Sequence, residues 1–211
     1  MDLAQERELV EKSRKDPESF GRLFDIYYGK IFAYIFKRTG HTQASQDITS
    51  EVFLKAYNKL WQFRWMNLSF GSWLYKIAGN EVNNYFKKGK TAPIPAEFIE
   101  ELEHLGVCAP SAELEFLGLE QQQASLQDLH LLHREILNLP PKYQEVMALR
   151  YFEDYSLKEI CKILGKKEGT VKSLLSRGVD MLEKKLQPNS TNEVISTKTI
   201  IKSTSYEQTG N

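Results

Sequence analysis

Seven polar side chains near the carboxyl end of the sequence have the types and spacing of a surface that binds DNA. They are Lys166, Lys167, Thr170, Lys172, Ser173, Ser176 and Arg177. In the major groove, long cationic side chains reach guanine acceptors, and hydroxyl groups contact bases or phosphates. A helix beginning near Gly169 would bury Val171, Leu175, Gly178 and Leu182, which turns the polar residues after Thr170 toward the opposite face.

A short helix before this segment would position it. Ser156 and Glu159 form the Ser-x-x-Glu pattern of a capping box, and Gly165 is a helix terminator. The apolar stripe of this short helix consists of Leu157, Ile160, Cys161 and Leu164. Two short helices joined by a glycine turn predict a helix-turn-helix, whose second helix enters the major groove. A plain helical hairpin with a solvated charged face is an equally good interpretation of periodicity alone.

A family resemblance favours the DNA-binding interpretation. Residues 139–152, 156–164 and 169–173 closely resemble region four of the sigma-70 superfamily, in its extracytoplasmic-function group. Residues 47–56 resemble the polymerase-binding helix of region two, and residues 70–80 resemble its promoter-melting helix. The resemblance implies a subunit that binds core RNA polymerase and directs promoter-specific transcription initiation from −35 and −10 elements. It also implies an anti-sigma factor as a partner.

The chain departs from the family pattern at several positions. Ser50 replaces a usual glutamine, and Gly71, Ser72 and Gly79 replace more frequent residues. Lys166, Lys167 and Glu168 stand where the family often has an aliphatic residue and a serine, so a good N-cap is lost and two cations are gained. Leu174 replaces a residue that is often basic. It could contact a thymine methyl group or simply widen the packed face.

The resemblance assigns two further sets of contacts. The first is with core polymerase, through Asp47, Glu51, Phe53 and Lys55. Asp47 and Glu51 are four residues apart on one helical face, so they could pair with basic groups of a partner, or be merely solvated. The second is with the −10 element, through Arg64, Trp65, Asn67, Lys76, Asn80, Asn83, Asn84, Lys87 and Lys88.

The −10 residues divide into a loop and a helix. In the loop of residues 62–69, Arg64 and Trp65 offer stacking surfaces and Asn67 an amide, which suit a flipped base of single-stranded DNA. Such an aromatic loop could equally cover the core. The lysines and asparagines of residues 76–88 are suited to phosphates and base edges.

Apolar periodicity predicts an all-α fold of two small helical domains. Helical stripes cover residues 20–35, 48–60 and 70–85, with Asp47 near the start of the second and a weaker fourth helix near residues 4–15. We expect domains at 1–90 and 130–186, joined by a flexible acidic linker at 91–129, with a disordered tail at 187–211. As a flexible coil the 39-residue linker would average about 35 Å. Two helical turns of DNA between promoter elements span about 70 Å, so polymerase would have to hold the domains apart.

Composition excludes other classes of protein. The basic and acidic residues balance at 28 each, but residues 1–90 carry a net charge of +5, residues 91–129 carry −8 and residues 130–186 carry +3. We expect a cytoplasmic protein, because the sequence has no apolar run long enough for a membrane span and no secretory signal. Two distant cysteines and four scattered histidines indicate no metal site, and no cofactor or enzymatic motif is present.

Two other functions are compatible with the helix-turn-helix. One is a stand-alone DNA-binding regulator that uses residues 1–90 for dimerisation or sensing. The other is an interaction protein that titrates another sigma factor or its inhibitor. The motifs at 47–56 and 70–80 favour the sigma factor, because a generic sensor has no reason to carry them.

Overall fold

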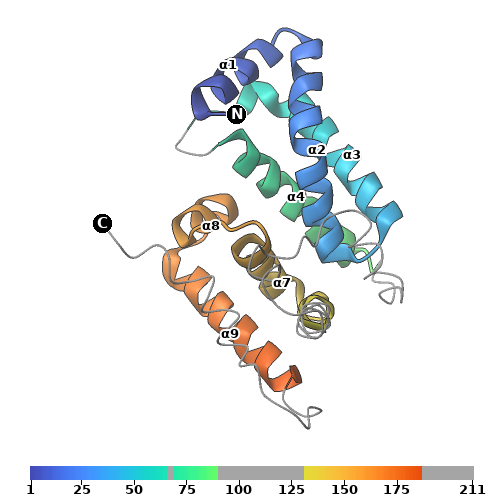
Figure 1. Cartoon of the computed structure of the whole chain (residues 1–211), viewed down its shortest axis with the longest axis vertical. Helices are drawn as coiled ribbons and strands as arrows, with labels where there is room; N and C mark the ends of the chain where they lie inside the picture. The colour runs from blue at the N-terminus through green and yellow to red at the C-terminus, as the bar shows by residue number, and fades with distance from the viewer. Residues whose placement is uncertain (66–68, 90–130, 187–211) are drawn as a thin grey trace, which may run out of the picture.

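The computed structural model describes residues 1–65, 69–89 and 131–186, which contain helices and no strand (Figure 1). Residues 131–137 are also helical. The first module contains α1 (Leu3–Ser13), α2 (Pro17–Thr39), α3 (Thr42–Lys59), a 3₁₀ turn η1 (Leu60–Gln62) and α4 (Phe70–Lys87). The second contains α7 (Pro141–Met147), a π-helical turn η3 (Ala148–Phe152), α8 (Leu157–Leu164) and α9 (Glu168–Leu186).

Side-chain caps and glycine fix the ends of α2. The Asp16 carboxylate accepts hydrogen bonds from the backbone N–H groups of Glu18 and Ser19, at 3.1 and 3.0 Å. Gly40 ends the helix at a φ of 69°, a left-handed conformation that glycine adopts without strain. The next helix, α3, begins at Thr42. Asp47 therefore lies in the second turn, and the sequence prediction that it stands near the start of this helix was wrong.

The three predicted apolar stripes form the core of the first module. Residues along them, such as Leu23, Val52 and Leu74, have no exposed surface. The weaker fourth helix is α1, and its buried residue Glu6 connects it to α2 and α4 through hydrogen bonds. The Glu6 carboxylate accepts hydrogen bonds from the Tyr27 hydroxyl of α2 and from the backbone N–H of Gly71 in α4.

The helix-turn-helix forms as predicted. The capping box is present, with the Ser156 backbone N–H donating to Glu159 at 2.8 Å, and Gly165 ends α8 at a φ of 63°. Ile163, which the predicted stripe omitted, is fully buried together with Ile160. Leu157, Cys161 and Leu164 are only partly buried and pack around this core.

The two modules pack directly against each other, which the sequence did not predict. Helix α8 contacts α4, and η3 contacts α2 (Figure 1). One continuous cluster of buried side chains includes Leu74 and Ala78 of the first module and Leu149, Ile160 and Val171 of the second. The predicted linker (91–129) and tail (187–211) lie outside the described residues.

The capping box provides a stability test. Ser156→Ala should lower the free energy of unfolding by about 1 kcal/mol, because α8 loses the acceptor for its third backbone N–H. Urea denaturation followed by circular dichroism measures the change. The matched control is Ser50→Ala, an exposed mid-helix serine whose hydroxyl donates to the Gln46 carbonyl. We expect this control to stay within about 0.5 kcal/mol of wild type; equal losses in both variants would contradict a capping role.

Candidate nucleic-acid interface

The seven side chains predicted on the helix-turn-helix are all exposed. The turn is held by the Lys167 carbonyl, which accepts from the backbone N–H groups of Thr170 and Val171 at 2.9 and 3.1 Å. On the buried side, Val171, Gly178 and Leu182 anchor α9. The helix therefore presents its polar face outward, as binding in a groove requires.

The structure gives further contacts for two residues of this surface, Lys172 and Leu174. Lys172 Nζ lies 2.6 Å from a carboxylate oxygen of Glu168, and this hydrogen bond raises the pKa of the Lys172 ammonium. Lys172 therefore stays charged, but it must break its ion pair with Glu168 before it can bind a DNA phosphate. Leu174 is half-buried and packs against the core around Val146 and Leu182, which supports the interpretation that it widens the packed face.

Helix α4 carries a second polar stripe. Lys76, Asn80, Asn84 and Lys88 recur every four residues, so they follow one face, and all four are exposed. Lys87 is exposed beside them. These five side chains, which we call the α4 stripe, can contact a DNA backbone that runs along the helix.

Asn83 does not belong to the α4 stripe. Its side-chain oxygen accepts from Arg38 Nη2 at 3.0 Å, and its side-chain nitrogen donates to Glu145 Oε1 at 3.1 Å. In this conformation Asn83 is not free to contact DNA, because both ends of its amide are occupied between the modules.

The predicted base-capture loop is described only in part. Arg64 is exposed, and its guanidinium donates to the carbonyls of Trp61 and Phe63 at 2.9 and 3.3 Å. Trp65 is half-buried, with its ring 5.0 Å from that of Phe63 in an edge-to-face arrangement. Asn67 lies outside the described residues. The aromatic part of the loop thus covers the core while Arg64 points outward.

The residues predicted to bind polymerase lie on α3, but not all are on its surface. Asp47 and Glu51 are exposed, and Lys55 is half-buried between Glu51 and Glu81 at 3.0 and 2.6 Å. Phe53 is only 3% exposed and packs in the core. The prediction that Phe53 contacts polymerase directly was wrong. Phe53 lies on the buried side of α3 and packs that helix against the core.

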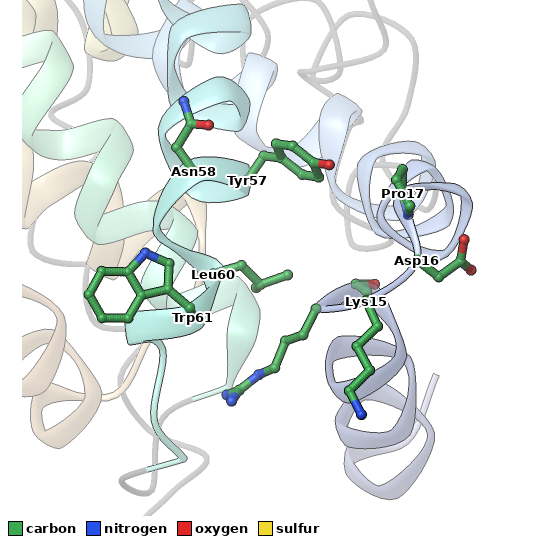
Figure 2. Close-up of a pocket in the computed structure, with 9 residues that line it drawn as sticks. Lys15, Asp16, Pro17, Tyr57, Asn58, Leu60 and Trp61 are labelled. Atoms are coloured by element: carbon green, nitrogen blue, oxygen red, sulfur yellow. The ribbon is translucent and has the colours of Figure 1, made fainter.

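The structure adds two surface residues that the sequence reasoning missed. Leu54 is 55% exposed and Trp61 is 66% exposed. Their spacing from Asp47 and Glu51 follows the helical repeat, a signal opposite to the buried stripe that could have revealed them. Figure 2 shows the Trp61 indole pointing away from the turn between α1 and α2, beside a pocket of about 310 Å³ whose lining includes Lys15, Asp16 and Tyr57.

A buried polar network joins the two modules beside the α4 stripe. Arg38 of α2 is 1% exposed, and its Nε and Nη1 atoms donate to Gln144 Oε1 and the Tyr34 hydroxyl at 3.3 and 3.2 Å. The Glu145 carboxylate lies 3.8 Å from the same guanidinium. Gln144 also donates to the Arg38 carbonyl at 3.0 Å. A buried charge is tolerated only when it is paired and hydrogen-bonded, so these contacts hold Arg38 in place.

A second polar contact lies across the same boundary. The Tyr75 hydroxyl of α4 donates to Glu153, and Lys37 Nζ of α2 lies 3.6 Å from the same carboxylate. The Tyr155 ring packs edge-to-face on Tyr75, 5.3 Å between centroids. Burial raises the pKa of the Glu153 carboxyl, and the charge of Lys37 opposes that rise.

In the described ranges, no three histidine, cysteine or acidic side chains come together as a metal site. Within the same ranges, no helix has the length and apolar character needed to cross a bilayer.

Comparison with known proteins decides the family. Residues 23–91 match the family described as Sigma-70 region 2, and residues 129–182 match Sigma-70, region 4. The chain is 33% identical to the ECF RNA polymerase sigma factor BldN of Streptomyces coelicolor, over 88% of this chain and 67% of the relative. It is 30% identical to the ECF RNA polymerase sigma factor SigW of Bacillus subtilis, over 89% of this chain and 99% of the relative.

The chain belongs to the extracytoplasmic-function sigma factors of RNA polymerase. Solved structures share the fold of this sigma factor. CnrH in complex with the cytosolic domain of CnrY has a TM-score of 0.59 and 18% identity, covering 88% of this chain and 99% of that one. The sigma factor RpoE in complex with the anti-sigma factor NepR from Bartonella quintana has a TM-score of 0.55 and 19% identity, covering 81% and 99%.

Family membership confirms the resemblance seen in the sequence. As a sigma factor, the protein directs transcription initiation by RNA polymerase. The exposed face of α9 lies within region 4, and both α3 and the α4 stripe lie within region 2. The family matches thus cover each surface that carries a predicted interaction.

Proposed function

We propose that this sigma factor divides promoter recognition between its two modules. Helix α9 reads the −35 element from the major groove, and the α4 stripe with Arg64 and Trp65 contacts the −10 element. A surface formed by Asp47, Glu51 and Leu54 of α3 and Trp61 of the following turn η1, which we call the α3 face, binds core polymerase. The observation that carries this proposal is that all seven polar side chains of the helix-turn-helix face solvent while the opposite side of α9 is locked in the core.

The proposed surfaces differ in chemistry. The α4 stripe presents cations and amides, and α9 presents cations and hydroxyl groups, which suit phosphates and base edges. The α3 face instead combines two carboxylates with two exposed apolar side chains, which suits a protein surface rather than DNA. We therefore assign α3 to a protein partner with a basic, partly apolar docking surface.

The proposal extends to the setting in which the protein works. It acts by binding and positioning, without catalysis of its own, in the cytoplasm where polymerase works. An anti-sigma factor is its expected inhibitor, since RpoE of Bartonella quintana, which shares the fold, forms a complex with the anti-sigma factor NepR. Exposed Leu54 and Trp61 offer an apolar contact for either protein partner.

Run-off transcription with purified core polymerase tests the proposal. The full chain is added to core enzyme on a library of promoter sequences, and transcripts are sequenced. We expect transcription only when the chain is present, from promoters that share two elements separated by about two helical turns. A chain that binds DNA but does not associate with core enzyme at low salt would instead be a stand-alone regulator.

Arg177→Ala tests the −35 assignment. If Arg177 reads a guanine, the variant should lose about 1–3 kcal/mol of binding and relax specificity at one position of the −35 element. If it contacts a phosphate, the salt dependence of log K should flatten by about 0.9. Fluorescence anisotropy on −35 duplexes at several salt concentrations separates these results. The control is Lys184→Ala, an exposed cation at the far end of α9, which should bind like wild type.

A further inference from the structure

The Glu145 carboxylate of the second module occupies an anion site built by the first. Its Oε1 atom accepts from Asn83 Nδ2 at 3.1 Å and lies 3.8 Å from Arg38 Nη1. The same oxygen is 2.7 Å from the position that a Cβ atom on residue 79 would take. A side chain at position 79 would displace this carboxylate, so Gly79 lets Glu145 approach α4 closely.

This site adjoins the α4 stripe. Gly79 and Asn83 each directly precede a stripe residue, namely Asn80 and Asn84. A DNA strand that follows the stripe therefore passes beside the site that Glu145 fills. Arginine guanidinium and amide N–H groups are donors that bind phosphate oxygens as readily as carboxylate oxygens.

The proposed promoter geometry requires the modules to separate. Two elements about two helical turns apart lie about 70 Å from each other. The modules instead share one buried core, with α8 against α4. When α7 leaves, Arg38 loses both Gln144 and Glu145 and keeps its hydrogen bonds with Tyr34 and Asn83. Glu145 is the acidic partner of Arg38 among the described residues, so this departure removes the charge that balances the guanidinium.

We propose that Glu145 is an intramolecular phosphate mimic: it fills an Arg38, Asn83 and Gly79 site that a promoter phosphate takes over when the modules separate. The packed conformation is thus autoinhibited, because the second module covers a DNA contact of the first. This inference rests on the proposed function, since it assumes that the α4 stripe follows promoter DNA.

Glu145→Gln tests the mimicry, because glutamine keeps the size of the side chain and removes its charge. Affinity of the full chain for a fluorescent −10 duplex is measured by anisotropy across salt concentrations, without polymerase. We expect roughly tenfold tighter binding and a salt slope steeper by about 0.9, the effect of one additional phosphate contact. Small-angle scattering without DNA should show a larger radius of gyration, because the contact between the modules is weakened.

The matched control is Glu135→Gln. Glu135 is also a partly buried carboxylate of the second module paired with a cation, Lys185, at 3.2 Å, but it is not at the site. It undergoes the same change of charge, so non-specific attraction to DNA changes equally. Identical affinities and slopes for Glu135→Gln and Glu145→Gln would overturn the proposal.

Two double variants test the site itself. Adding Arg38→Met to Glu145→Gln should abolish the gain in affinity and restore the shallower slope. Since Arg38 is fully buried and its loss could prevent folding, Asn83→Ala in the same background gives a second test and should remove part of the gain. Retention of the whole gain in a folded double variant would overturn the phosphate site. Binding of wild type to core polymerase is measured separately, so that failure of the proposed function is distinguished from failure of the mimicry.

Discussion

Reversing one charge on α3, by Glu51→Lys, should weaken binding to core polymerase by about 30-fold or more. Truncating one partner of a buried, hydrogen-bonded charge pair at an interface costs about 2–5 kcal/mol, and a reversed charge adds repulsion. Glu51 is exposed and its partner in the free protein is Lys55, at 3.0 Å. Loss of this exposed pair should have little effect on folding. Biolayer interferometry with immobilised core enzyme measures the dissociation constant.

The chain contains a closely matched control for this charge reversal. Glu8 of α1 is exposed and pairs with Lys12, four residues later, at 2.7 Å. Glu8→Lys makes the same change in net charge and in local helix pairing, away from the α3 face. It should bind core enzyme like wild type. If Glu51→Lys does the same, α3 is not the docking helix.

Shortening a core side chain of α4, by Leu74→Ala, should destabilise the protein by about 2–5 kcal/mol. Leu74 has no exposed surface and lies in the cluster of buried residues that joins the modules. The substitution removes apolar contact and leaves a cavity that the surrounding helices fill only in part. For a chain of this size the melting temperature should fall by on the order of 10 °C, measured by differential scanning calorimetry.

Leu54→Ala removes the same atoms from an exposed position. Because Leu54 is 55% exposed, its truncation should change the unfolding free energy by no more than about 0.5 kcal/mol. The two variants also differ in their expected effect on function. Leu54→Ala should weaken polymerase binding without changing the free energy of unfolding. Leu74→Ala should lower the free energy of unfolding. Equal melting temperatures for the two variants would show that Leu74 does not lie in a packed core.

The buried network holds the modules together, whereas the proposed promoter binding needs them apart. Arg38 links the modules in the packed form, since it is paired with Glu145 and hydrogen-bonded to Gln144. The proposed binding of two promoter elements about two helical turns apart requires the same contacts to break. Polymerase, which would bind α3 on an exposed surface, can offset this cost by holding the modules apart.

Local patterns in the sequence determined the helices, the helix-turn-helix and most of its exposed polar residues. Apolar spacing identifies the buried face of each helix, and a capping box or glycine identifies its end, because both depend on residues within one or two turns. The motif at residues 156–173 also indicated the family, because contacts within a single module determine which residues it contains.

Tertiary structure alone decided which of these residues are free to act. Phe53 and Asn83 carry the right types for an interface, yet Phe53 packs in the core and Asn83 is bonded between Arg38 and Glu145. Asn83 and Glu145 are 62 residues apart in the sequence, so no local periodicity relates them. Contacts of that range depend on how whole helices pack, and this is why the sequence revealed the modules but not the anion site between them.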